Sequence, residues 1–366
     1  MRKHHAQNER IKRQYFAYLE EAKRMSKSSV DQVAAAIAQF ETSTGYRDFR
    51  AFHIEQARKF KRQLAEAINP ATGKPLAKAT IYSRLMALKA FFTWLAGQPG
   101  YKSRLTYSDT DYFNPSNNDG RIAKAVRKRP APTLEQVRHV LARMPRETDI
   151  EKRDRALVAF ALVSGARDDA IASMSLRHVN LTDRTVFQDA REVRTKNRKT
   201  FTSNFFPVGA EIEAIVTDWI LYLTRKKLFG SDDPLFPATC VAVGKSGQFE
   251  PAGLARRHWR DAGAIRRIFR RSFETAGLPY SNPHLCRDTL TLLGEQRCPT
   301  PEAFKAWSQN LGHEHVLTTL TSYGAVSAAR QAEILNSMQG DGAGAGAEPD
   351  PETVRQVVAH LMKKAS

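Results

Sequence analysis

Apolar residues recur at helical spacing through the first hundred positions of the chain. Four segments follow this pattern and are predicted to be helices: residues 9–25, 28–45, 54–68 and 80–97. Ser29 and Thr80 are the expected N-caps of the second and fourth helices, and Gly45 is the expected end of the second. Four amphipathic helices in so short a stretch predict a small helical bundle over residues 1–112.

Residues 113–132 break this pattern, because Pro, Asn, Ser and Gly replace the apolar repeat. The later part of the segment is basic, with no acid among its cations: Arg121, Lys124, Arg127, Lys128 and Arg129. We therefore expect a flexible basic linker whose cations contact the phosphates of DNA. A linker that merely solubilises the chain is the alternative interpretation.

A second domain is predicted from residue 133 to residue 338. Thr133 is its expected first N-cap, with Gln136 completing a capping box, and a buried helix is expected to end at Gly165. Short strands are expected at 185–188, 191–195 and 200–208, and the basic turn 196–199 is expected to join the last two. Further helices are predicted at 210–226, 262–277, 284–297, 301–310 and 326–338. The predicted fold class is therefore mainly α with a small β-sheet.

Residues 339–366 read as a Gly/Ala tether followed by a short amphipathic helix at about 351–364. Its apolar stripe consists of Val354, Val357, Val358 and Leu361. A helix this short is marginal in water by itself. We expect it to need a docking surface, either on its own molecule or on a neighbouring one.

The excess of basic over acidic residues indicates a polyanionic partner, which the helical pattern alone does not. The chain of 366 residues carries 57 Lys+Arg against 38 Asp+Glu, a formal net charge of +19. Residues 1–130 hold 25 of these basic residues and only 11 of the acidic ones. Such a balance is typical of nucleic-acid-binding proteins, and its concentration at the front suggests a DNA grip followed by a more specialised domain.

Cysteine usage and hydropathy limit the compartment. The three cysteines, Cys240, Cys286 and Cys298, are too few and too scattered for a disulfide scaffold, and they fit a reducing cytoplasm. No apolar run reaches the 18 residues of a membrane span, and the basic start has no apolar stretch behind it. We expect a cytoplasmic, nucleoid-associated protein with no membrane contact.

Candidate chemistry lies in four short motifs of the second domain. Each alone is more often structural than functional: a Gly-Ala-Arg is commonly a helix end followed by a charge, and a basic β-turn is commonly a solvated turn. The motifs, in chain order, are "SGAR" with Arg167, "RTKNRKT" with Lys196 and Lys199, "HLCR" with His284 and Arg287, and "LGHEHVLTTLTSYG" with His313 and Tyr323.

Together, and in this order, these motifs resemble the tyrosine recombinases, the phage integrase and Xer family. The resemblance covers nearly the whole chain, since the front bundle looks like the core-binding domain of that family and a basic linker follows it. It implies two domains that clamp DNA. It also implies a site-specific recombinase that needs no metal, ATP or other cofactor.

The resemblance also implies a role for each matching residue. Arg167 and Arg287 are expected to bind the scissile phosphate, since guanidinium groups stay charged and match its oxygens. The phenol of Tyr323, whose unperturbed pKa is about 10, is the expected nucleophile that forms a 3′-phosphotyrosine. Lys196 matches the β-turn lysine that protonates the leaving oxygen, with Lys199 as the nearby rival; His284 and His313 match the two histidine positions.

Two departures from the family pattern stand out. Ala170 occupies the position three residues after the first arginine, where family members commonly carry an acid. Asp169, one residue earlier, is the expected substitute that would orient Arg167. The interval from His313 to Tyr323 is also one residue longer than the usual pattern.

Three other interpretations remain open. A zinc site at "HEH" is disfavoured, because His313 and His315 lie two residues apart and would diverge on a helix. A type IB topoisomerase would use the same chemistry to relax supercoils alone. A non-catalytic DNA-binding regulator on the same fold would not need the intact set of six residues.

The expected partners follow from the resemblance. Double-stranded DNA carrying specific recombination sites is the substrate, and assembly into a tetramer on DNA is expected. Either the helix at 326–338 or the one at 351–364 would pass to the neighbouring protomer. An accessory directionality factor and a bacterial, phage or other mobile-element origin also fit this reading.

Overall fold

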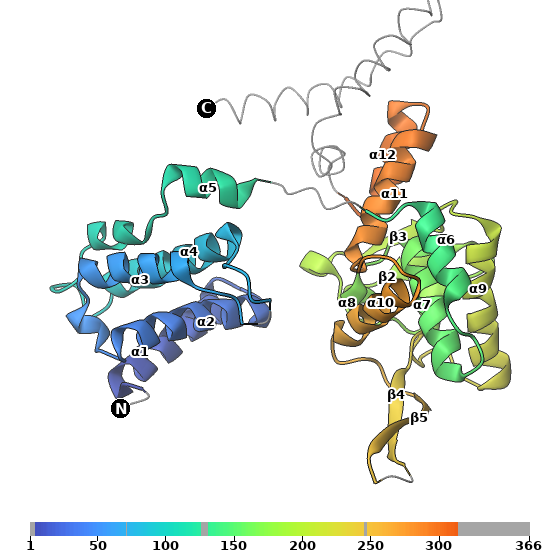
Figure 1. Ribbon diagram of the computed structural model, residues 1–366, viewed down its shortest axis with the longest axis horizontal. Coiled ribbons are helices and arrows are strands. Elements are labelled where there is room, and N and C mark those ends of the chain that lie inside the picture. Colours follow the sequence, from blue (N-terminus) through green and yellow to red (C-terminus); the bar gives the residue numbers. More distant parts are fainter. Residues whose placement is uncertain (1–3, 71, 126–130, 245–246, 314–366) are drawn as a thin grey trace, which may run out of the picture. The chain divides into compact units, whose positions relative to one another are not determined.

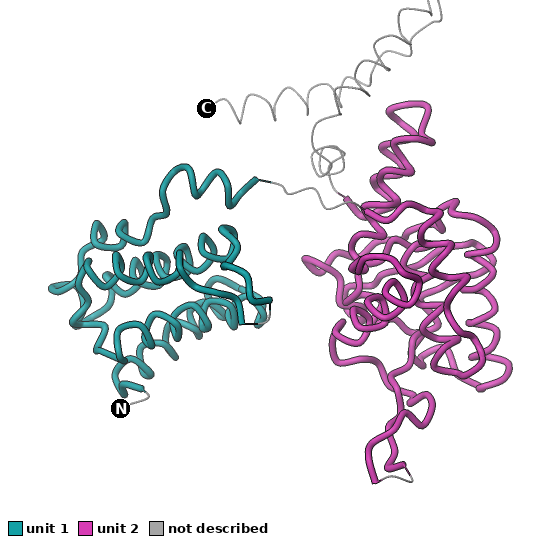
Figure 2. The backbone as a smooth tube through the Cα atoms, viewed as in Figure 1, with its two compact units in different colours: residues 1–127 teal, residues 128–366 magenta. Residues whose placement is uncertain are grey.

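The computed structural model describes residues 4–70, 72–125, 131–244 and 247–313. The chain divides into two compact units, residues 1–127 and 128–366 (Figure 2). Each unit buries its own hydrophobic cluster. The described chain is mostly helical with small antiparallel sheets, as predicted, and none of its helices is long and apolar enough to cross a membrane (Figure 1).

Unit 1 is a bundle of helices joined by short turns. Its main helices are α1 (Ala6–Ala17), α2 (Lys27–Thr44), α3 (Ile54–Glu66), α4 (Lys78–Ala96) and α5 (Asn117–Lys124), with a π-helical turn at Tyr18–Ala22 and 3₁₀ turns at Phe49–Ala51 and Ser108–Phe113. Gly45 ends α2 in a left-handed conformation, with φ of 65°, as predicted.

The two predicted N-caps in unit 1 are wrong. Ser26, not Ser29, caps α2, because its side chain accepts a hydrogen bond from the backbone N–H of Ser29. Helix α4 begins at Lys78 behind Ala77, which has no side chain able to cap, rather than at Thr80. At α2, Ser26, Ser28 and Ser29 could each form a cap, so composition alone left the starting residue ambiguous; at α4 no capping side chain marks the start.

Aromatic rings hold the bundle together. Phe40 of α2 meets Phe60 of α3 and Phe92 of α4 edge-on, each with centroids 5.3 Å apart. Phe113, in the last 3₁₀ turn, also packs edge-on against Phe40 at 5.6 Å. Such edge-to-face pairs are favourable beyond the area they bury. These four phenylalanines are therefore core residues of the bundle.

The segment expected to be an irregular linker contains a helix. Helix α5 starts where the Ser116 side chain accepts the backbone N–H of Asp119, at 3.0 Å, and it packs against α4. Asp119 also pairs with Lys78 at 2.7 Å, and the Lys124 ammonium lies 5.4 Å from the centroid of the Tyr82 ring. Arg121 is exposed on this helix. The other three basic residues expected to contact DNA here, at 127–129, lie outside the described residues.

Unit 2 has a long central helix surrounded by shorter elements. Its helices are α6 (Leu134–Arg143), α7 (Asp149–Ser164), α8 (Asp168–Ile171), α9 (Ala210–Leu221), α10 (Gly263–Thr275), α11 (His284–Arg297) and α12 (Pro301–Asn310). The capping box of Thr133 with Gln136 and the end of α7 at Gly165 are both confirmed. Every residue of α7 from Ala156 to Ser164 is buried, so this helix is the core of the unit.

The first sheet of unit 2 has three antiparallel strands: β1 (Val179–Asn180), β2 (Thr185–Gln188) and β3 (Phe201–Asn204). Strands β2 and β3 match predicted strands, and Gln188 pairs with Phe201 in their register. The strand predicted at 191–195 is wrong. Those residues belong to a loop, 189–200, which opens with a turn: the backbone N–H groups of Glu192 and Val193 donate to the carbonyl of Asp189, at 3.0 and 2.7 Å, instead of to a neighbouring strand.

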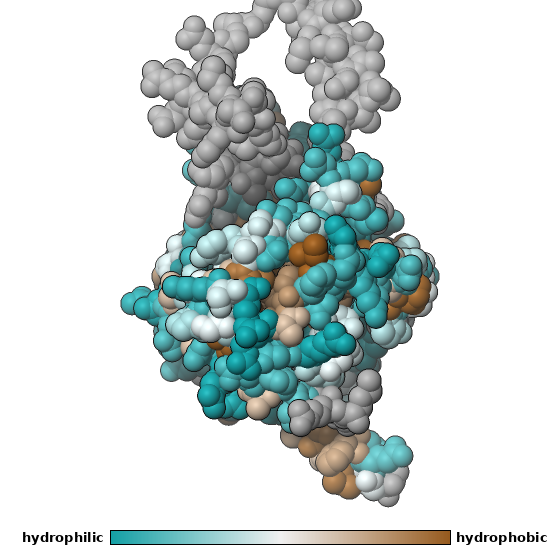
Figure 3. Space-filling view, turned by 90° about the vertical axis from the view of Figure 1, so that its left-hand side faces the viewer, coloured by the Kyte–Doolittle hydropathy of each residue, from teal (hydrophilic) through white to brown (hydrophobic). Residues whose placement is uncertain are grey.

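The second sheet is a hairpin that the sequence did not predict, β4 (Ala238–Val243) with β5 (Phe249–Ala255). It projects from the unit and exposes the hydrophobic side chains of Val241, Val243 and Phe249 (Figures 1 and 3). Pro251 and Gly253 within β5 are residues that usually argue against a strand, which explains the omission. The helices predicted at 326–338 and 351–364 lie outside the described residues.

The tight end of α7 gives a stability prediction. Gly165 has φ of +61°, and a Cβ there would lie 3.0 Å from both Leu311 and Phe206. Gly277 has φ of +74°, but a Cβ there would meet nothing within 4 Å. We expect Gly277→Ala to cost only backbone strain, about 1–2 kcal/mol. Gly165→Ala should cost about 1–3 kcal/mol more, because overpacking adds to the strain.

Urea unfolding of the full chain, followed by tryptophan fluorescence, measures both costs. Trp219, Trp259 and Trp307 all belong to unit 2 and report its unfolding. Equal losses for the two variants would contradict the packing argument at Gly165.

Candidate active site

Three segments of unit 2 converge on one buried guanidinium group. Arg287, on the first turn of α11, is only 3% exposed. Its Nη1 donates to the carbonyl of Gly165 at the end of α7. Its Nη2 donates to the carbonyl of Leu311, at 2.6 Å, and to Nε2 of His313, at 3.0 Å. The "SGAR", "HLCR" and "LGH" motifs, far apart in the sequence, are therefore joined through Arg287.

Gly312 allows the "LGH" segment to approach strand β3. Its φ is +72°, and a Cβ would lie 2.8 Å from the ring of Phe201. The carbonyl of Gly312 in turn accepts a hydrogen bond from Nζ of Lys199, at 3.4 Å. A glycine at this position thus brings the loop between β2 and β3 to the same place as Arg287 and His313.

Arg167 lies beside this cluster as the N-cap residue of α8. It is half-buried, and burial lowers the pKa of its guanidinium group. Its positive charge helps to lower the pKa of both His284 and His313, which places it close to both imidazoles. Among the residues that the structure describes, none forms a hydrogen bond or ion pair with the Arg167 side chain.

The two histidines share an electropositive environment but differ in exposure. His284 is exposed; desolvation and the charges of Arg287 and Arg167 lower its pKa, while Asp288 acts in the opposite sense. His313 is half-buried, and desolvation followed by Arg287 and Arg167 lowers its pKa to about 4. Because Arg287 donates to Nε2 of His313, that nitrogen is the acceptor and the neutral ring carries its proton on Nδ1.

The two candidate lysines lie in different surroundings. Lys196 starts a 3₁₀ turn (Lys196–Arg198) and is exposed, without a side-chain partner among the described residues. Lys199 is half-buried, contacts Gly312, and contributes to the lowered pKa of His313. The structure thus brings the rival lysine, Lys199, to the cluster and leaves Lys196 on the surface of the loop.

The expectation that Asp169 orients Arg167 is wrong. Oδ1 of Asp169 accepts a hydrogen bond from Nε of Arg194, at 2.9 Å. Oδ2 of its neighbour Asp168 accepts one from Nε of Arg266, at 2.8 Å. The carboxylates of both acids that follow Arg167 thus pair with other arginines. Ala170, at the position where the family commonly has an acid, is buried in the core. Sequence reasoning missed both arginines: Arg194 opens the "RTKNRKT" motif, but only the lysines of that motif were predicted site residues, and no motif contains Arg266.

Two other groups near the "HLCR" helix carry nucleophilic atoms. Cys286 is fully buried, and desolvation raises the pKa of its thiol to about 12. Tyr280, half-buried, has the Arg270 guanidinium 4.2 Å above its ring. The predicted nucleophile Tyr323 and the neighbouring His315 both lie outside the described residues.

The cluster has the composition of an oxyanion site. Two guanidinium groups and one ammonium group surround a histidine that is neutral at physiological pH. Planar guanidinium groups bind the oxygens of phosphate well, and a preorganised set of such donors can stabilise charge that develops on them.

Comparisons with known proteins agree on the fold. No protein-family model and no curated protein matches the sequence. Solved structures do match. A dimer of lambda integrase residues 75–356 bound to a COC′ core site is 12% identical, with a TM-score of 0.59, over 86% of this chain and 94% of that one.

Two further structures give the same result. The Tn1549 transposon integrase in complex with transposon right end DNA is 15% identical, with a TM-score of 0.58, over 90% of this chain and 99% of that one. A lambda integrase tetramer bound to a Holliday junction is 13% identical, with a TM-score of 0.55, over 87% and 80%. The chain therefore has the fold of the tyrosine recombinases and integrases, as the motifs predicted.

The lowered pKa of His313 predicts a pH dependence of stability. The unfolded imidazole has a pKa of about 6.5, so it binds a proton more readily than the folded one. The free energy of unfolding should therefore fall as the pH is lowered from 6.5 to about 4. His313→Gln should remove part of this fall.

NMR titration of the His313 ring in the DNA-free protein tests the cause directly. A midpoint at or above 6.5 would contradict the assigned environment.

Proposed function

We propose that this protein is a site-specific DNA recombinase, or integrase, which cleaves and rejoins DNA strands through a 3′-phosphotyrosine intermediate formed on Tyr323, without metal or ATP. The observation that carries the proposal is the cluster around Arg287. This cluster brings together the buried guanidinium group of Arg287, the guanidinium group of Arg167, which has no partner among the described residues, and the ammonium group of Lys199. It occurs in a chain that has the fold of the integrases.

Each part of the cluster has a task in this reaction. Arg167 and Arg287 bind the nonbridging oxygens of the scissile phosphate and stabilise the charge of the pentavalent transition state. The Tyr323 oxygen forms a bond to phosphorus as the bond from phosphorus to the 5′-oxygen breaks. His284 accepts the phenol proton, and His313 donates a hydrogen bond to the phosphate from its protonated nitrogen.

Lys199 is the group that we assign to the leaving 5′-oxygen, in place of Lys196. Its ammonium lies next to Gly312 and His313, and it sits on a loop at the edge of the site. Proton donation prevents an alkoxide from leaving unprotonated. A 5′-hydroxyl of another strand then attacks the phosphotyrosine, takes over the phosphate and releases Tyr323, so the energy of the phosphodiester is retained.

DNA and further copies of the chain are the proposed partners. The net charge of +19, the exposed Arg121 and Lys124 of α5 and the basic residues 127–129 support a grip on the duplex. The similar integrases are DNA-bound as a dimer and as a tetramer. We propose the same kind of assembly here, with a helix of the region 326–364 passed to the neighbouring protomer. An accessory factor that sets direction is compatible with this scheme.

The proposed organisation is a core-binding domain at 1–112, a basic segment at 113–132, a catalytic domain at 133–338 and a C-terminal element at 339–366. In the described chain, the boundary between the compact units falls inside the basic segment. Helix α5 of that segment packs with the first unit, so the connection proper is shorter than the sequence suggested.

A nicked suicide substrate tests the reaction and the nucleophile together. On a duplex carrying the attachment site with a nick just beyond the cleavage position, the short 5′-hydroxyl fragment diffuses away and traps the covalent protein–DNA adduct. We expect an adduct at the 3′-phosphate with the wild-type chain and none with Tyr323→Phe, while DNA binding is kept. An adduct formed by Tyr323→Phe would contradict the assignment of Tyr323 as the nucleophile. Relaxation of plasmids that lack the site would favour a topoisomerase instead.

The assignment of Lys199 gives a second prediction on the same substrate. Lys199→Ala should slow single-turnover cleavage by about 10²–10⁴-fold, the usual contribution of a positioned acid. Lys196→Ala should mainly weaken DNA binding, because its side chain is exposed on the loop. The reverse order of effects on the cleavage rate would restore Lys196 as the general acid.

A further inference from the structure

The loop between β2 and β3, residues 189–200, contains two kinds of basic side chain. Its basic residues are Arg191, Arg194, Lys196, Arg198 and Lys199. The side chains of Lys196 and Arg198 have no hydrogen bond or ion pair with any residue that the structure describes. Arg191 and Arg194, in contrast, are bound to carboxylates, of Asp189 and Asp169 respectively. Some of these cations are therefore part of the scaffold and others are left for a ligand.

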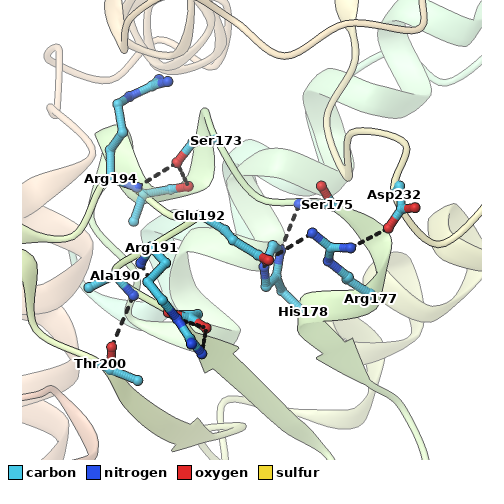
Figure 4. Close-up of polar contacts among 12 residues, drawn as sticks. Ser173, Ser175, Arg177, His178, Ala190, Arg191, Glu192, Arg194, Thr200 and Asp232 are labelled. Carbon is cyan, nitrogen blue, oxygen red and sulfur yellow. Dashed lines mark hydrogen bonds and ion pairs between the residues drawn. The ribbon is translucent and has the colours of Figure 1, made fainter.

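Arg194 connects the loop to the helix that follows Arg167. Its backbone N–H donates to Oγ of Ser173, at 2.9 Å (Figure 4). Its Nε donates to Oδ1 of Asp169, at 2.9 Å, and its Nη2 to the carbonyl of Trp259, at 3.1 Å. Asp169 lies in α8 and Ser173 directly after it. One arginine thus fixes the loop relative to the element that begins with the first catalytic arginine.

Glu192 gives the loop a second anchor. Its Oε2 accepts hydrogen bonds from Nε2 of His178 and from Nη2 of Arg177, both at 2.9 Å (Figure 4). Nδ1 of His178 accepts the backbone N–H of Ser175, at 2.9 Å, so its proton resides on Nε2 and points at Glu192. Because His178 is buried, this contact has little freedom to move.

The ends of the loop are also closed. The backbone N–H of Ala190 donates to Oγ1 of Thr200, at 3.0 Å, and Val193 is buried in the core of the unit. The anchors therefore lie at residues 190–194 and 200. The turn between them ends at Lys199, whose Nζ reaches the carbonyl of Gly312.

We propose that Arg194 and Glu192 are positioning residues, which hold the loop so that Lys199 reaches the leaving oxygen. Neither side chain needs to touch DNA for this role. The inference rests on the proposed function, since it presumes that Lys199 donates a proton there. Misplacing a catalytic group by about 1 Å can cost about 10²-fold in rate. Loss of the Arg194 contacts should thus slow proton donation while Arg167 and Arg287 still bind the phosphate.

A substrate that needs no proton donor separates positioning from other roles. When sulfur replaces the bridging 5′-oxygen, the leaving group is a thiolate, whose conjugate acid has a pKa of about 8.5, far below that of an alcohol. Such a group leaves without general acid catalysis. We expect Arg194→Gln to cleave the oxygen substrate about 10–100-fold more slowly than wild type, and the sulfur substrate at nearly the wild-type rate.

Arg198→Gln is the matched control, since it removes the same charge from the same loop at a side chain without a described partner. This variant should weaken DNA binding and reduce the magnitude of the slope of log affinity against log salt concentration by about one. Its cleavage rates on the oxygen and sulfur substrates should change by the same factor. Glu192→Gln and Asp169→Asn should also slow cleavage of the oxygen substrate and leave the sulfur substrate nearly unaffected, with a smaller effect than Arg194→Gln. Arg194→Lys keeps the positive charge but loses the planar guanidinium group that binds two acceptors at once. Its cleavage rate on the oxygen substrate should therefore lie between those of Arg194→Gln and the wild type. Thermal melting checks that each variant is folded.

Lys199→Ala and Tyr323→Phe distinguish failure of this inference from failure of the proposed function. If Lys199→Ala is rescued by sulfur and Arg194→Gln is not, Arg194 acts on the phosphate or on folding, and the positioning role is refuted. If Lys199→Ala is not rescued either, the assigned acid is wrong and the positioning role falls with it. If Tyr323→Phe still forms the adduct, the proposed reaction itself fails.

Discussion

The arrangement of unit 2 depends on the buried guanidinium group of Arg287. An arginine that is 3% exposed has lost its water and must find acceptors inside the protein. It finds the carbonyls of Gly165 and Leu311 and the Nε2 of His313. These acceptors belong to two separate segments of unit 2, the end of α7 and the "LGH" segment, and the hydrogen bonds therefore fix the position of the cation between them.

This one constraint explains why glycines stand where they do. The carbonyl of Gly165 can face Arg287 only if α7 ends in a left-handed turn, and its neighbours Leu311 and Phe206 leave no room for a side chain. Gly312 has the same backbone requirement and the Phe201 ring beside it. The first turn after α7 and the end of the "LGH" segment are both shaped by what Arg287 needs. Replacing either glycine would disturb the acceptors around Arg287 as well as a turn.

The sequence predicted the parts of the fold that local chemistry decides. The capping box at Thr133, the end of α7 at Gly165 and strand β2 follow from residues within a few positions of each other. The candidate site could be named because its residues occur in a recognisable order. Which lysine reaches it could not be predicted, because that depends on how twelve residues of loop are folded against distant elements.

The errors have a common physical origin. The segment 191–195 places Val193 between two charged residues, a pattern that predicts a strand, yet Glu192 and Arg194 bind separate partners on the body of the unit. Asp169 stands beside Arg167 in the sequence, but its carboxylate faces Arg194 instead. In both cases the deciding partner is remote in the sequence, and no periodicity encodes it.

Around the site, the acids divide the arginines into two groups. Asp168, Asp169 and Asp189 each hold an arginine of the surrounding scaffold, namely Arg266, Arg194 and Arg191. Arg167, next to two of these acids in the chain, receives neither of them. The net positive charge of the protein is thus not spread evenly over its arginines. Carboxylates neutralise these three scaffold arginines, whereas the charge of Arg167 acts on His284 and His313 and helps to lower the pKa of both imidazoles.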